Sequence, residues 1–149
     1  MRRGTAVGAA VALVLEALAI ALVNWLLGLA IRHQSMSLAG LDPDAMAIGS
    51  WVAGGVFALF LIGCAVLALR IARRDRMTGR VARIVLIVCA VVQGVAGAVV
   101  VGPVGWPAFV ALMVVLSLLV ATLVLYAPED QPRPAAVPEP GELPPPATA

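Results

Sequence analysis

Long apolar stretches alternate with short polar breaks along most of the chain. The apolar stretches cover residues 5–31, 45–69, 84–102 and 107–126. Each is close to, or longer than, the roughly 20 residues that an α-helix needs to cross a hydrocarbon core of about 30 Å. The pattern therefore predicts an all-α membrane protein with four transmembrane helices, at about residues 5–31, 43–71, 82–102 and 107–126.

The connections between these stretches are short, which favours antiparallel packing of helices that are neighbours in sequence. One connection ends in Asp42 and Pro43, a helix start in which Asp caps free backbone N–H groups and Pro takes the first helical position. We expect a single antiparallel four-helix bundle over residues 1–127. The remaining segment, 128–149, is rich in Pro and acidic residues, and such a composition predicts a disordered tail.

The overall composition agrees with a membrane protein. Hydrophobic residues make up 62% of the chain and charged residues 12%, against about 25% charged residues in soluble domains. The chain contains no Lys, and its basic residues are all Arg apart from one His. This bias, together with abundant Ala, Val and Gly, is typical of a bacterium with a GC-rich genome, so we expect the bacterial plasma membrane.

The arginines predict the orientation of the helices. Eight arginines flank the predicted spans on one side, against one, Arg32, on the other. The eight are Arg2, Arg3, Arg70, Arg73, Arg74, Arg76, Arg80 and Arg83. Because basic residues of short loops stay on the cytoplasmic side, we expect both termini in the cytoplasm. Trp25, Trp51 and Trp106 then lie at the outer interface and Tyr126 at the inner one, as interfacial aromatic residues do. The arginines from Arg70 to Arg83 are expected to attract anionic lipid headgroups.

One acidic side chain, Glu16, lies inside an apolar stretch. An ionised carboxylate near the bilayer centre costs about 2.5 kcal/mol or more, so Glu16 is expected to be mostly protonated and to face other helices. Counted from the helix ends, Gln93 and Ser117 lie at a similar depth, and we predict a polar belt of Glu16, Gln93 and Ser117. The belt is interpreted either as a structural clasp between helices or as a proton or cation site.

Other polar residues do not form a recognisable site. Cys64 and Cys89 are expected at one depth on adjacent helices, where buried Cys acts as a small apolar residue. His33 shares a loop with Asp42 and Asp44, but their spacing is not that of a metal site. We therefore expect no catalytic residues, no metal, no cofactor, no enzymatic activity and no nucleic-acid partner.

Two resemblances add to this interpretation. Residues 36–46 (MSLAGLDPDAM), with Glu16 between Leu15 and Ala17, resemble small integral membrane proteins of actinobacteria. That resemblance covers residues 1–127 and implies a membrane location without an assigned activity. The helix number and Glu16 also resemble small multidrug-resistance transporters, in which a Glu of the first helix binds cation and proton alternately. Those transporters line their pocket with aromatic residues, and this chain departs from that pattern.

These observations lead to two functional hypotheses. The first is a small accessory or interaction protein, embedded in the lipid bilayer, whose partners are other membrane proteins or copies of itself. Its basis is two sets of small residues at intervals of four, which allow close helix approach. They are Gly4, Gly8 and Ala12 in the first predicted helix and Ala90, Gly94, Ala98 and Gly102 in the third. The alternative is a small proton-coupled transporter that uses Glu16.

Overall fold

The chain folds into four long helices. The computed structural model describes residues 2–34, 40, 42–76, 79–102 and 104–127. Within these ranges the helices are α1 (Arg2–Gln34), α2 (Pro43–Arg74), α3 (Arg80–Val100) and α4 (Trp106–Tyr126). All four are long and apolar enough to cross a membrane, which confirms the all-helical class and the predicted helices. The predicted tail, 128–149, lies outside the described residues.

Local sequence explains where the helices begin and end. The side chain of Asp42 accepts a hydrogen bond of 2.8 Å from the backbone N–H of Asp44, and Pro43 opens α2, as the sequence predicts. Asp75 ends α2 in the left-handed region, with φ of 53°. Gly79 and Gly105 precede α3 and α4 with φ of 107° and 98°, values that a residue with a Cβ rarely adopts.

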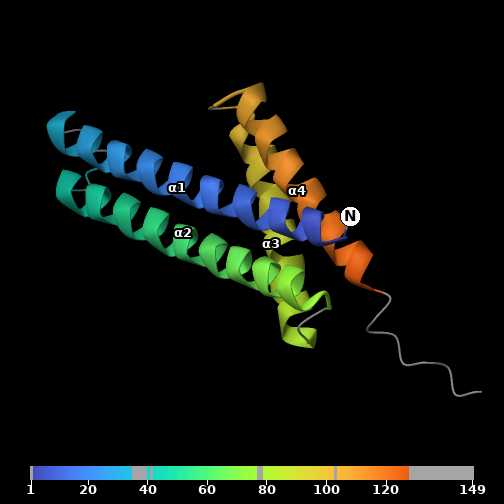
Figure 1. Cartoon of the computed structure of the whole chain (residues 1–149). Coiled ribbons are helices and arrows are strands. Elements are labelled where there is room, and N and C mark those ends of the chain that lie inside the picture. The colour runs from blue at the N-terminus through green and yellow to red at the C-terminus, as the bar shows by residue number, and fades with distance from the viewer. Residues whose placement is uncertain (1, 35–39, 41, 77–78, 103, 128–149) are drawn as a thin grey trace, which may run out of the picture.

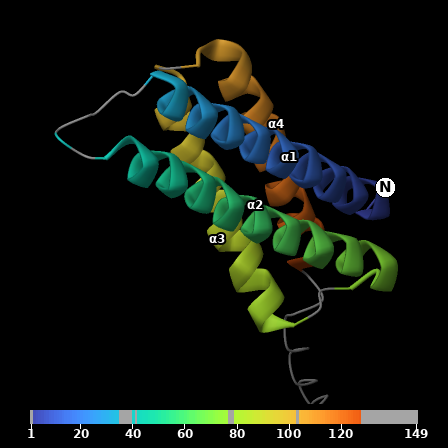
Figure 2. The same ribbon diagram turned by 90° about the vertical axis from the view of Figure 1, so that its left-hand side faces the viewer.

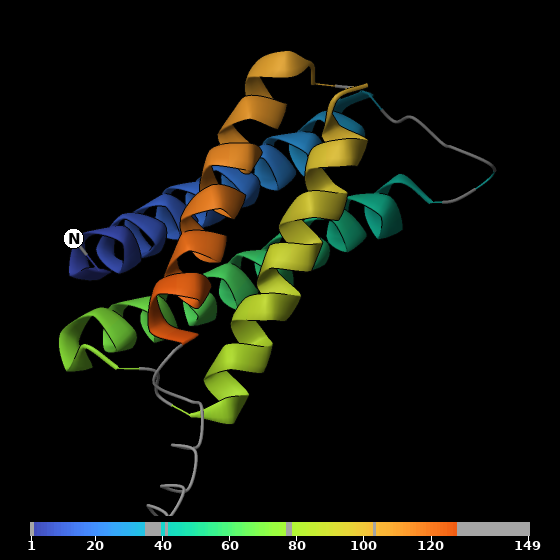
Figure 3. The same ribbon diagram turned by 90° about the vertical axis from the view of Figure 1, so that its right-hand side faces the viewer.

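The helices are arranged as two pairs that cross each other. α1 lies along α2, and α3 lies along α4, in all three views (Figures 1, 2 and 3). Contact between the two pairs is made mainly by α1 with α4, whereas α2 and α3 touch over a short length. In Figure 1 the pair of α3 and α4 runs steeply across the pair of α1 and α2.

Alanines of α1 and α2 make up much of the buried core. They are Ala6, Ala10, Ala17, Ala58, Ala65, Ala68 and Ala72. Two glycines bring the helices still closer near the start of α2. A Cβ added to Gly28 would lie 2.1 Å from Nε1 of Trp51, and one added to Gly54 would lie 2.4 Å from Cβ of Asn24. Small side chains at these contacts therefore set the distance between α1 and α2.

Polar contacts hold each end of the α1–α2 pair. At one end, which we call the tryptophan end, the rings of Trp25 and Trp51 stack with centroids 5.5 Å apart. Trp51 donates from Nε1 to the backbone oxygen of Trp25 over 3.2 Å. Nε of Arg32 donates to Oδ1 of Asp44 over 2.8 Å in an ion pair beside these rings. These contacts join the end of α1 to the start of α2.

The opposite end, which we call the arginine end, connects three helices. Arg2 donates from Nη2 to the backbone oxygen of Leu125 over 2.6 Å, a favourable position for a cation because helix C-termini carry partial negative charge. The Tyr126 hydroxyl donates to Oδ1 of Asp75 over 3.2 Å, and Nε of Arg3 lies 3.3 Å from Oδ2 of the same carboxylate. Asp75 thus links the end of α2 to the start of α1 and the end of α4.

We predict that Gly54→Ala destabilises the protein by about 1–3 kcal/mol, the usual cost of overpacking. The reason is that the added methyl would overlap Cβ and Cγ of Asn24, which lie next to the α1 backbone and cannot move away freely. Gly55→Ala is the matched control, because no described residue lies within 4 Å of its added Cβ. Thermal unfolding of the purified proteins in the same detergent compares them. Equal midpoints for the two variants would contradict the proposed close contact.

Candidate functional site

A hydrogen bond between Glu16 and Gln93 joins α1 to α3. Nε2 of Gln93 donates to Oε2 of Glu16. Gln93 belongs to the buried row of α3, together with Leu86, Cys89 and Gly97, and its exposed fraction is 0%. Glu16 is half-buried on α1, next to the buried Ala17. The pair is therefore a polar contact between the two crossing helix pairs.

Two oxygens of this pair have no hydrogen-bond partner among the described residues. Both Oε1 of Glu16 and Oε1 of Gln93 are buried and unpaired. An ionised carboxylate only accepts hydrogen bonds, whereas a protonated carboxyl also donates one. Protonation of Glu16 therefore supplies a donor to a pair that otherwise has surplus acceptors. An ionised Glu16 would instead need a donor or a cation from elsewhere.

Ser117 does not join this pair, and its place in the predicted polar belt is wrong. The Ser117 side chain is exposed and donates to the backbone oxygen of Met113, one turn back on the same helix, over 2.7 Å. The buried row of α4 is instead Val115, Leu119, Thr122 and Tyr126. Counting residues gives the depth of a side chain along the helix axis but not the side of the helix that it faces. Ser117 lies on the opposite side of α4 from that buried row.

A cavity of about 300 Å³ lies beside Glu16, between the two helix pairs. Its walls come from all four helices, with Phe57 on α2, Ala96 on α3 and Leu112 on α4 among them. It extends from Glu16 along α1 to Asn24, and Val104 in the α3–α4 connection also lines it. The volume is at the lower end of the range for small-molecule sites. The cavity is mostly apolar, with Glu16 as its acidic group.

Asn24 and Ser50 have structural hydrogen bonds. The side-chain amide of Asn24 donates to the backbone oxygen of Ile20 over 2.9 Å, and the Ser50 hydroxyl lies 3.3 Å from Oδ1 of Asn24. Cys64 and Cys89 are buried free thiols. His33 is exposed at the end of α1. Among the described residues, no three His, Cys, Asp or Glu side chains come close enough to hold a metal ion.

The polar contacts of Tyr126 were not predicted from the sequence. Tyr126 was expected only as an interfacial aromatic residue, but its exposed fraction is 0% and the guanidinium of Arg2 lies 5.3 Å from its ring centre. One signal was present, because Val115, Leu119, Thr122 and Tyr126 recur at intervals of four and three residues. That spacing places them on one helix face.

Comparison with known proteins found no relative of this chain. No protein-family model matches the chain, no curated protein matches it, and no solved structure resembles it.

Proposed function

We propose that this chain is a multi-pass protein of the bacterial plasma membrane that binds other membrane proteins and has no enzymatic activity. In this proposal the four helices form an antiparallel set of spans, and both termini lie in the cytoplasm. The supporting observation is a small-residue face of α3 that the other helices leave uncovered. We call this face, made of Gly94 and Ala98 on α3 and of Gly102 in the turn just beyond its end, the α3 glycine face.

The α3 glycine face lies away from the row of α3 that packs inside the protein. That buried row contains Cys89, Gln93 and Gly97, whereas Ala98 and Gly102 are exposed and Gly94 is half-buried. Among the residues that the structure describes, nothing lies within 4 Å of a Cβ added to Gly94 or Gly102. Small residues at intervals of four let another transmembrane helix approach closely. The α3 glycine face is therefore suited to contact with the helix of a partner protein.

Two of the small residues at the same spacing on α1, Gly8 and Ala12, instead pack inside the protein. A Cβ added to Gly8 would meet Cδ2 of Leu118 on α4 at 3.8 Å. Ala12, one turn further, packs against the buried core. Gly8 and Ala12 are therefore already in contact with other helices, which leaves the α3 glycine face as the surface for a partner.

We predict that a photo-crosslinking residue at Ala98 captures a discrete membrane-protein partner in cells. The same residue at Val110 is the control, because Val110 is exposed on α4 and lies at a similar distance from the α3–α4 connection. Gly94→Leu should remove the Ala98 product without lowering the amount of protein in the membrane. Equal capture from Ala98 and Val110, or transport of a solute by the purified protein alone in liposomes, would contradict the proposal.

The cavity beside Glu16 favours one alternative function, a small proton-coupled transporter. Such a transporter needs a carboxyl that changes its protonation state within reach of a substrate. Glu16 lines the cavity and has an unpaired oxygen, so it meets part of that requirement. The structural interpretation needs only the hydrogen bond to Gln93.

Glu16→Gln separates the two functions, because it preserves shape and hydrogen bonding but cannot titrate. We expect the variant to fold and reach the membrane with a loss of about 1 kcal/mol or less, in keeping with hydrogen bonds between membrane helices. Glu16→Leu should be less stable, because Gln93 then loses its acceptor. Thermal unfolding in detergent measures both variants. Proton-driven flux in liposomes that the parent shows and Glu16→Gln lacks would establish the transporter instead.

The proposed orientation predicts which connection an impermeant thiol reagent reaches from outside intact cells. In a chain with Cys64→Ala and Cys89→Ala, we expect Ser37→Cys to react and Thr78→Cys to react only after the membrane is opened. The basis is the group of arginines that flanks position 78 and is expected to stay in the cytoplasm. The reverse pattern would overturn the orientation.

A further inference from the structure

An apolar groove runs along the α1–α2 pair toward the arginine end. Its volume is about 270 Å³, and all the residues that line it are apolar and belong to α1 and α2. Ala10 and Ala65 are buried in its floor, and Val11 and Val66 are exposed beside it. The groove is separate from the cavity beside Glu16, which lies between the two helix pairs.

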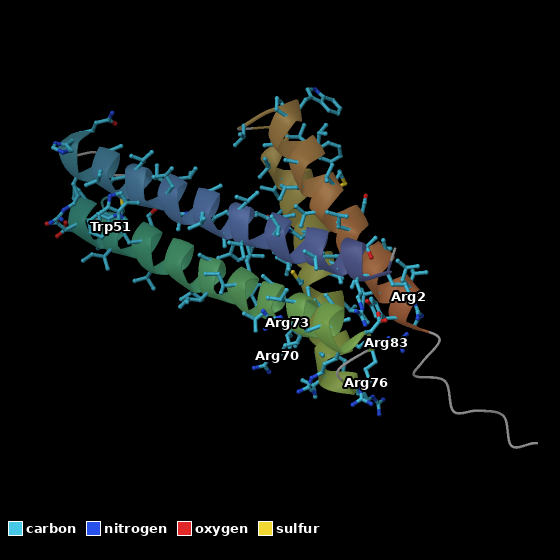
Figure 4. All side chains as sticks on the ribbon, viewed as in Figure 1. Arg2, Trp51, Arg70, Arg73, Arg76 and Arg83 are labelled. Carbon is cyan, nitrogen blue, oxygen red and sulfur yellow. The ribbon has the colours of Figure 1, made fainter. Side chains whose placement is uncertain are left out.

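Arginines continue the groove-lining faces of both helices. Arg70 follows Val66 by four residues, and Arg73 follows Leu69 by four residues, so each lies one turn beyond a groove residue on the same face of α2. Arg3 precedes Val7 by four residues on α1 in the same way. Figure 4 shows Arg70 and Arg73 on α2 near the arginine end. An apolar groove therefore ends among positively charged side chains.

The length of the groove corresponds to one leaflet of a bilayer. On α1 the groove-lining residues run from Val7 to Leu15, which is about 12 Å at the helical rise of 1.5 Å per residue. Half of a hydrocarbon core is about 15 Å. With the arginines at the depth of the headgroups, the groove covers most of the depth that one acyl chain occupies.

We propose that the groove, Arg70, Arg73 and Arg3 form a binding site for one anionic phospholipid. One acyl chain lies in the groove between α1 and α2. The phosphate lies between Arg70 and Arg73, since guanidinium groups bind phosphate oxygens through paired N–H donors. Arg3, whose charge is partly offset by its ion pair with Asp75, lies at the same end of the groove. This site does not depend on the partner proposed for the α3 glycine face.

Native mass spectrometry of the full-length protein in a mild detergent tests the headgroup requirement. Phosphatidylglycerol should bind as one retained molecule, at least tenfold more tightly than phosphatidylcholine with the same chains. Arg70→Gln with Arg73→Gln should weaken phosphatidylglycerol binding by roughly thirtyfold, given the usual contribution of an arginine near an anionic headgroup. Arg76→Gln with Arg80→Gln makes the same change in net charge outside the groove and should leave binding within about threefold of the parent.

A second pair of variants tests the acyl-chain requirement. Val11→Trp fills the groove and should weaken phosphatidylglycerol binding with every arginine in place. Val95→Trp is the control, because Val95 is exposed on α3 away from the groove. Circular dichroism of each variant should match the parent, which excludes unfolding as the cause of a loss.

Three results would overturn the proposed site. Equal losses in the two double-arginine variants would mean that charge attracts lipid without a defined position. Unchanged binding in Val11→Trp would remove the groove from the site. Displacement of the lipid by millimolar glycerol phosphate, which has the headgroup chemistry without acyl chains, would mean that the arginines bind free phosphate compounds and not a lipid.

Discussion

Close approach of α1 and α2 is the constraint on which the rest of the structure depends. In a hydrocarbon environment apolar side chains gain little by leaving lipid for protein, so helix association relies on close packing and on hydrogen bonds. The alanine-rich core and the contacts of Gly28 with Trp51 and Gly54 with Asn24 meet that requirement for this pair. The pair then presents one surface to α4 and α3, which cross it and contact it over a shorter length.

Several side-chain hydrogen bonds join elements that apolar packing alone would leave free to slide. Arg2 and Asp75 link three helices at the arginine end, and Arg32 and Asp44 link two at the tryptophan end. Between these ends, Glu16 and Gln93 connect the two helix pairs. Sliding of one pair along the other would break that contact, so the Glu16–Gln93 bond sets the register in which the pairs cross.

Much of the fold was predictable because helix length and apolar composition are strong signals for membrane spans. The start of α2 was predictable from Asp42 and Pro43, and the level of Glu16 and Gln93 from counting residues along their helices. The rotation of each helix about its own axis was not predictable. For this reason Ser117 was placed in the polar belt and the contacts of Tyr126 were missed. The crossing of the two pairs depends on how side chains interlock between helices, and the pattern along one chain does not report it.

The two helix pairs differ in length, and this has a mechanical consequence. α1 has 33 residues and α3 has 21, or about 50 Å and 32 Å at the helical rise. A long apolar helix fits a thinner hydrocarbon layer by tilting, so in the proposed membrane location the longer pair tilts more than the shorter one. The crossing angle then follows bilayer thickness. A thicker membrane would bring α1 and α2 closer to upright and would reshape the space beside Glu16. The shape of that space would then respond to changes in the lipid composition of the surrounding membrane.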